Sequence, residues 1–294
     1  MDHIDFSKIY SFSKLNLFEQ CPQAYHFTYL HEVYSKMKSQ FRKDPSNIWP
    51  FNTLGKAVHD AITLFLYLPE KEKTLENLKE QLKASWWSEA MPQKIPPLGK
   101  WGGFKNLNEE RQYYKEALKL LANFYKTFDQ KIKIKLLPTR NIKRSIDDYK
   151  KLIKPVNDNF DISGKLDLVL DLNNGSLEVV DFKTGKSEEK DDFQLRFYKL
   201  LTELNFGQPV SKASFYYLRT GNIKEFNLEK DDLEKIKKEV IKKIKKIQAQ
   251  KEYITKPSKL CRYCMFKTFC PAKKEVSQYI QEPLQEGFAD DLPF

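Results

Sequence analysis

The segment DISGKLDLVLDLNNGSLEVVDFKTGK, residues 161–186, constrains the fold more than any other part of the chain. Apolar and polar residues alternate along it on both sides of an Asn-Asn-Gly sequence, a pattern that predicts a β-hairpin. We expect a three-residue loop, Asn173-Asn174-Gly175, with Gly175 in the left-handed conformation. That loop places Asp167 opposite Asp181, whereas a two-residue turn would place Asp167 opposite Phe182.

The hydrophobic pattern of the hairpin selects the first of these registers. Alternate residues of a strand share a face, so Lys183 is expected on the same face as Asp181. A slip of one residue would move these charged side chains into the core. The expected buried face consists of Leu166, Leu168, Val180 and Phe182.

Two carboxylates that face each other need an explanation, because opposed like charges destabilise a sheet unless a cation or a shared proton relieves them. Carboxylate oxygens are ligands that Mg²⁺ and Mn²⁺ prefer, and such ions also bind phosphate and promote hydrolysis of phosphodiesters. Lys183 could then orient the nucleophile or neutralise developing negative charge. The alternative is a solvated hairpin with Asp–Lys surface pairs.

The rest of the chain predicts helices before the hairpin and a mixture of helices and strands after it, which indicates one α/β domain with a small mixed sheet. Residues 36–53 and 92–106 contain proline or glycine in polar surroundings and are expected to be loops. Helices are expected over residues 11–33, 53–66, 74–90, 107–130, 193–206 and 229–249, and a further strand over residues 213–221.

The charge and the composition bound the class of protein. The chain has 294 residues and 51 Lys and Arg against 40 Asp and Glu, a net charge of +11. This excess suits a polyanionic partner such as DNA, although a lysine-rich composition can produce it without one. There is no run of eighteen apolar residues and no secretory signal pattern at the start. We therefore expect a cytoplasmic protein with no membrane partner.

Four segments in order, GKAVH, GKLDLVLD, VVDFKTGK and QLRFYKLL, resemble the RecB-like branch of the PD-(D/E)xK nucleases. This branch includes AddB-type nuclease domains and CRISPR-adaptation nucleases, and the resemblance covers residues 11–271. It implies a restriction-endonuclease-like α/β core with a small mixed sheet flanked by helices. The proline of the family motif is absent here, since Leu166 precedes Asp167.

The resemblance also implies roles for individual residues. His59 would join Asp167 and Asp181 as a ligand of Mg²⁺ or Mn²⁺, and Lys183 would be the catalytic lysine. Gln194 and Tyr198 match a Gln-x-x-x-Tyr motif, which places them on one helical face. They would contact the DNA backbone or support Lys183.

Four cysteines are arranged as one plus three: Cys21 alone in EQCP, and Cys261, Cys264 and Cys270 in a C-x2-C-x5-C pattern followed by proline. In a reducing compartment such residues are ligands or free thiols rather than disulfides. Four thiolates can hold Zn²⁺ or an iron–sulfur cluster. The arrangement resembles the [4Fe–4S] site of RecB-like nucleases, which implies a cluster that joins the N- and C-terminal ends of the domain.

The last residues, ADDLPF, resemble the acidic C-terminal tip of bacterial single-stranded-DNA-binding proteins. Such tips dock a terminal Phe and its carboxylate on repair or replication proteins. Asp290, Asp291, Pro293 and Phe294 are therefore candidates for partner docking, although a short motif of this kind also arises by chance. We expect a nuclease domain over residues 1–276 and a flexible tail over residues 277–294.

Together these features predict a metal-dependent DNA nuclease, an exonuclease that acts on single strands or DNA ends in repair or recombination. One alternative is a nuclease of CRISPR adaptation, which shares all of the motifs. Another is a catalytically inactive DNA-binding module stabilised by the cluster. The intact set of Asp167, Asp181 and Lys183 argues against inactivity, because a binding module has no need for opposed carboxylates.

Overall fold

The computed structural model describes residues 6–86, 97–137, 153–188 and 192–281. Its main element is a five-stranded mixed sheet with the strand order β2-β5-β6-β7-β8, beside a three-stranded sheet with the order β1-β4-β3. In the larger sheet β6 and β7 are parallel, and the other neighbouring strands are antiparallel. The strands are β1 Ile9–Ser11, β2 Lys133–Leu136, β3 Ile153–Asn157, β4 Phe160–Ser163, β5 Leu168–Asp171, β6 Leu177–Lys183, β7 Val210–Tyr217 and β8 Asn222–Asn227.

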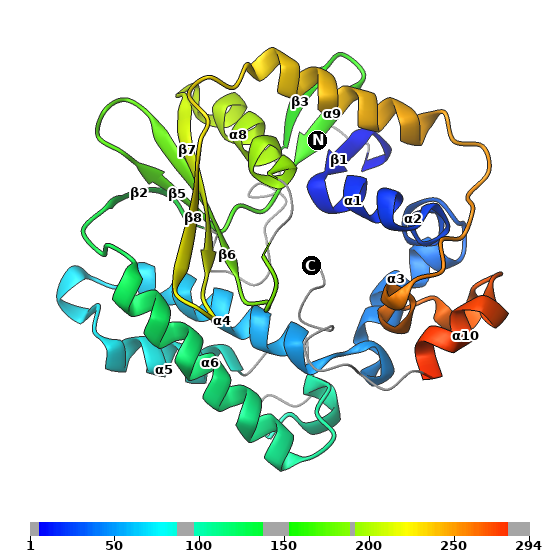
Figure 1. Ribbon diagram of the computed structural model, residues 1–294, viewed down its shortest axis with the longest axis horizontal. Coiled ribbons are helices and arrows are strands. Elements are labelled where there is room, and N and C mark those ends of the chain that lie inside the picture. The colour runs from blue at the N-terminus through cyan, green and yellow to red at the C-terminus, as the bar shows by residue number, and fades with distance from the viewer. Residues whose placement is uncertain (1–5, 87–96, 138–152, 189–191, 282–294) are drawn as a thin grey trace.

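Helices cover both faces of the larger sheet (Figure 1). One face packs against α4, α5 and α6, and the other packs against α8, α9 and α1. A small α/β core with a mixed sheet flanked by helices was the expectation, and the larger sheet confirms it. The helices are α1 Phe12–Gln20, α2 Pro22–Tyr29, α3 Tyr34–Lys43, α4 Pro50–Leu66, α5 Leu75–Trp86, α6 Leu107–Thr127, α8 Phe193–Phe206, α9 Leu233–Gln248 and α10 Lys273–Gln281.

The hairpin of β5 and β6 has the predicted register. Leu168 pairs with Val180 and Asp171 pairs with Leu177, and Asp167 directly precedes the first paired residue. The backbone N–H of Leu172 donates to the carbonyl of Ser176 at 3.1 Å, so the loop consists of the three expected residues. Gly175 has a φ of 86°, in the left-handed region that glycine adopts without a steric penalty.

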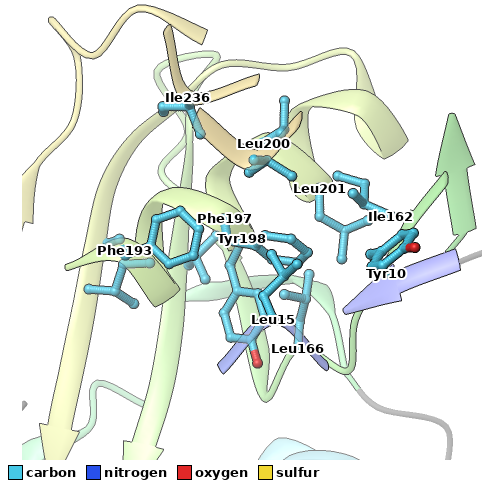
Figure 2. Packing of buried hydrophobic residues seen from close by; sticks show 14 of the residues in the cluster. Tyr10, Leu15, Ile162, Leu166, Phe193, Phe197, Tyr198, Leu200, Leu201 and Ile236 are labelled. Carbon is cyan, nitrogen blue, oxygen red and sulfur yellow. The ribbon is translucent and has the colours of Figure 1, made fainter. Parts of the chain in front are cut away.

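The face of Leu168, Val180 and Phe182 is buried as expected, but the opposite face of the hairpin is buried too. Every residue of β5 is buried, and so is every residue of β6 before Lys183. The second face is buried because α8 packs over it, and its apolar residues join Phe197, Leu200 and Leu201 in one cluster (Figure 2). Leu166 belongs to this second cluster rather than to that of Leu168, because it precedes the strand and does not follow its alternation.

The predicted N-terminal helix over residues 11–33 is instead a short strand followed by two helices. Helix α1 ends at Gln20 and α2 begins at Pro22, so Cys21 lies at the break with an extended backbone. Proline is tolerated in the first turn of a helix and cannot continue one, which explains the position of the break.

Two predicted loops are partly ordered secondary structure. Residues 34–43 form α3, which has no buried residue of its own and is held by ring contacts of Tyr34 and Phe41 with Phe266. In the second loop, Leu98 and Phe104 are buried in the core. The buried carboxylate of Glu110 on α6 fixes this segment by accepting hydrogen bonds from the backbone N–H of Leu98 at 2.9 Å and of Gly99 at 3.0 Å.

Helix α10 continues to Gln281, so its last five residues fall within the range 277–294 that was expected to be a tail. The proposed docking residues Asp290, Asp291, Pro293 and Phe294 lie outside the described residues, so partner docking stays a prediction. Among the described residues, no helix combines the length and the apolar composition that a membrane span requires.

Candidate active site

The candidate site lies at the carboxyl end of β6, where Asp181 and Lys183 share one face of the strand. The Asp181 side chain is only 8% exposed, and its Oδ2 lies 3.1 Å from Nζ of Lys183. Asp167 enters from the start of the neighbouring strand, and its Oδ2 accepts a hydrogen bond from the backbone N–H of Phe182 at 3.0 Å. The hairpin register thus brings both carboxylates and the lysine to one place.

Helix α4 supplies the imidazole of the site. Nδ1 of His59 lies 3.1 Å from Oδ1 of Asp167, and the His59 ring meets the ring of Phe182 edge to face at 6.2 Å between centroids. Burial disfavours the charged imidazole, but the adjacent Asp167 carboxylate outweighs it and raises the pKa of His59. For Asp167, burial is likewise outweighed by His59 and by the Phe182 N–H, so the pKa of this carboxyl is lowered.

Gln194, in the first turn of α8, connects the lysine to the carboxylate. Its Oε1 accepts a hydrogen bond from Nζ of Lys183 at 2.8 Å, and its Nε2 donates to Oδ1 of Asp181 at 3.0 Å. The same Nε2 donates to the hydroxyl of Tyr198 at 3.3 Å. Because the carbonyl faces a cation and the amide group faces an anion, the orientation of this side chain is determined by its partners.

Tyr198 is largely a core residue. It is 8% exposed, it lies among Leu15, Phe197 and Leu201, and only its hydroxyl reaches the site (Figure 2). Its pKa is raised, chiefly by burial and further by the nearby Asp181 carboxylate. The hydroxyl therefore stays protonated and can hydrogen bond with Gln194.

Phe215 is a site residue that we did not predict. It pairs with Asp181 across the parallel strands β6 and β7, and Nζ of Lys183 lies 4.9 Å from the centroid of its ring. A cation over an aromatic face is attracted by the ring quadrupole. The sequence signals neither the parallel pairing nor its register, so no local pattern indicates this contact.

Asp181 carries the largest electrostatic cost in the site. Burial raises its pKa to about 6; the Lys183 ammonium opposes this shift, and the Asp167 carboxylate adds to it. The lysine and the glutamine therefore relieve the buried charge only in part. A group of this kind at a site of hydrogen-bonded, partly buried polar residues is typical of functional positions.

The donor chemistry of the site fits a hard divalent cation, since it combines two buried carboxylates with an imidazole. The described residues nevertheless contain no group of three or more His, Cys, Asp or Glu side chains that converge as metal ligands. His59 and Asp167 bond to each other, while both oxygens of Asp181 are occupied by Lys183 and Gln194.

Cys21 lies at the break between α1 and α2, and Cys261, Cys264 and Cys270 lie in or beside the short turns of residues 259–270. All four are free thiols. Burial raises the pKa of Cys264 to about 12, and the other three cysteines add to the shift. Among the described residues the four do not converge as a metal site, so a cluster that joins the two ends of the domain is not shown.

The buried indole of Trp49 bears on whether the cysteines could hold a metal or an iron–sulfur group. Nε1 of Trp49 is buried with no hydrogen-bond partner among the described residues, and its ring lies 4.8 Å from that of Tyr263, between Cys261 and Cys264 in the sequence. Buried N–H groups are rarely left without an acceptor. Four thiols and an N–H donor suit a sulfur-rich group.

Comparison with protein families places the whole site within one match. The sequence model of the PD-(D/E)XK nuclease superfamily matches residues 9–271. This range includes the hairpin, the helices of His59 and Gln194, and all four cysteines. No curated protein matches the chain.

Proposed function

The chain belongs to the PD-(D/E)XK nuclease superfamily, and from this premise we propose that it hydrolyses phosphodiester bonds of DNA at the site of Asp167, Asp181 and Lys183. The observation that carries the proposal is the position of Lys183, bound at once to Asp181 and Gln194 beside the Asp167–His59 pair. A structural ion pair would need neither a second carboxylate nor a polar helix start directed at it.

Nucleases of this superfamily usually use Mg²⁺ or Mn²⁺. Asp167, Asp181 and His59 are the residues that would hold the ion, which would act as a Lewis acid and lower the pKa of a bound water. The protein contributes the buried, preorganised charges. Their low-dielectric surroundings strengthen each electrostatic interaction with a phosphate.

We assign to Lys183 the role of stabilising the negative charge that develops on the phosphate during the reaction. Its ammonium is held by a carboxylate, an amide oxygen and an aromatic face, so it needs little reorganisation when charge develops on the phosphate oxygens. Gln194 positions this ammonium, and Tyr198 positions Gln194. Both act through Lys183 rather than on the substrate.

The finer proposal is an exonuclease that acts on single strands or DNA ends in repair or recombination. It is supported by the order of the four RecB-like motifs, which all fall within the family match. An exonuclease needs a free DNA end, whereas an endonuclease cuts internal bonds. A DNA substrate without ends therefore distinguishes the two activities.

We expect the purified protein to degrade end-labelled linear single-stranded DNA in Mg²⁺ or Mn²⁺, and to leave a closed single-stranded circle of the same sequence intact. EDTA should abolish the degradation, because the carboxylates alone cannot activate water. Gel electrophoresis of time courses measures both. No hydrolysis of any substrate with any divalent ion would refute the nuclease, and cutting of the circle would refute the exonuclease alone.

We further propose that Cys21, Cys261, Cys264 and Cys270 hold a [4Fe–4S] cluster, with Zn²⁺ as the alternative. The proposal is supported by the four free thiols, three of which add to the raised pKa of Cys264, and by the buried N–H of Trp49. Such a cluster would close a very long loop and so stabilise the fold.

Protein purified without oxygen should be brown and contain about four iron atoms per chain. Cys264→Ser should lose iron and unfold at a lower temperature, because a thiolate ligand is gone. Lys259→Gln, in the same turn, is the control and should keep both. Metal analysis, absorbance and thermal unfolding give the readouts; a colourless wild type that contains zinc would contradict the cluster.

A further inference from the structure

Helix α9 concentrates positive charge to a degree that no neighbouring helix shares. Its sixteen residues include seven lysines and two glutamates, in a chain whose net charge is +11. Of the helices packed against α9, α8 has two basic residues against one acidic residue and α1 has one of each. Helix α3 is also basic, with four basic residues and no acidic one.

The lysines of α9 are sorted onto one side of the helix. Its inner face packs into the core through Ile236, Val240, Ile244 and Ile247 (Figure 2 shows Ile236 beside Leu200 of α8). Steps of three and four residues align side chains along a helix, so the exposed lysines form one continuous row. We call this row the lysine stripe; it consists of the exposed residues Lys235, Lys238, Lys242, Lys245 and Lys246.

The stripe has charge to offer a partner. The two half-buried lysines of α9 form ion pairs, Lys237 with Glu234 at 3.7 Å and Lys243 with Glu19. Among the residues that the structure describes, no carboxylate lies within ion-pair distance of the five stripe lysines. At 1.5 Å per residue the stripe is about 16 Å long, and one strand of a duplex places about five phosphates along that length of its helix axis, at about 3.4 Å of axis per phosphate.

The helix that carries the stripe adjoins the candidate active site. Glu239 of α9 binds Arg196 of α8 at 2.8 Å, and Nζ of Lys243 lies 4.5 Å from the ring centroid of Phe193. Phe193 and Arg196 flank Gln194, which holds Lys183. Helix α9 thus runs across the start of α8, and Figure 1 shows it extending from there over α1.

We propose that the lysine stripe binds the phosphate backbone of the DNA strand that extends beyond the active site. This inference rests on the proposed nuclease function and adds to it a second, sequence-independent contact with the substrate. Ammonium groups on exposed stems bind phosphates as point charges and release condensed counterions, so the contact should appear in the salt dependence of DNA binding.

The test compares a stripe variant, in which all five lysines are replaced by Gln, with a control variant of equal charge change. DNA affinity is measured by fluorescence anisotropy in EDTA over a range of salt concentrations, with labelled single-stranded and duplex DNA of one length. Glutamine keeps the helix propensity of the replaced residues. The control replaces five exposed lysines on or directly after α5 and α6: Lys83, Lys115, Lys119, Lys126 and Lys131.

We expect the magnitude of the slope of log affinity against log salt to fall by about 3.5 to 4.5 in the stripe variant, and affinity near 0.1 M salt to fall at least about tenfold. The control variant should keep a slope close to that of the wild type, and Lys→Arg at all five stripe positions should restore it. A reduction with duplex or with single strands supports the contact and identifies the strand that it serves.

Equal slopes in the stripe and control variants would overturn the inference. If the wild type still cleaves DNA, the proposed nuclease function would stand. A stripe variant with a changed circular dichroism spectrum is set aside in favour of single Lys→Gln changes, each expected to lower the slope by about 0.7 to 0.9. Wild-type protein that neither binds nor cleaves DNA would overturn the proposed function, and the stripe contact with it.

Discussion

Asp181→Asn is expected to lower the rate of DNA hydrolysis by about a thousandfold while leaving the protein folded. The asparagine keeps the size of the side chain and can still accept a hydrogen bond from Gln194 or Lys183. It removes the negative charge that binds Nζ of Lys183 at 3.1 Å and that would hold a divalent cation. A loss of hydrolysis in this variant would therefore report on the chemistry of the site and not on unfolding.

The same hairpin offers a matched control. Asp171 lies at the other end of β5, where its carboxylate pairs with Lys133 at 2.9 Å. Asp171→Asn removes an equal charge from the same two strands without touching the site, so it should hydrolyse DNA at nearly the wild-type rate. Single-turnover rates with saturating protein give the comparison. Equal rates for the two variants would exclude Asp181 from the chemistry.

Thermal unfolding at several pH values in EDTA gives a second readout for Asp181→Asn. Burial raises the pKa of Asp181 to about 6, above its value in the unfolded chain. Between these two values the folded protein binds more protons than the unfolded one, so stability falls as the pH rises. The Tm of the wild type should therefore fall relative to that of the variant as the pH rises from about 4 through 6.

The hairpin was predictable because its determinants are local. Alternation of apolar and polar residues sets the face of each side chain, and Gly175 sets the loop length. Together they gave the register of β5 and β6 and the three-residue loop correctly. The burial of both faces was not predictable from the hairpin alone, because it depends on α8, the helix that follows β6 in the chain.

The remaining site residues depended on contacts between distant segments. His59 was indicated by the family resemblance, and its contact with Asp167 spans more than a hundred residues of chain. Phe215 was missed because parallel pairing leaves no short-range signal. Helix α3 was missed for a similar reason: its sequence is polar, and the rings that hold it come from residues near Cys264.

The segment before α6 shows how such distant contacts determine stability. Gly103 has a φ of 79°, and a Cβ built on it would lie 2.6 Å from the carbonyl oxygen of Ile48 and 2.8 Å from Cα of Trp49. These are backbone atoms directly before α4, whose Thr53 hydroxyl donates to the carbonyl of Gly102 at 3.0 Å. The approach of this segment to α4 therefore leaves no room for a side chain.

Gly103→Ala is expected to lower the free energy of unfolding by about 3 kcal/mol, from a left-handed backbone of about 1 kcal/mol and a backbone collision of about 2 kcal/mol. Gly99→Ala is the matched control, because Gly99 also has a positive φ, 54°, but nothing lies within 4 Å of its Cβ position. It should lose only the first contribution. Urea unfolding measures both variants, and equal losses would show that Ile48 and Trp49 yield to the added methyl group. A larger loss in Gly103→Ala would show that the collision strains the start of α4, and the cleavage rate should then fall in Gly103→Ala alone, because this helix carries His59.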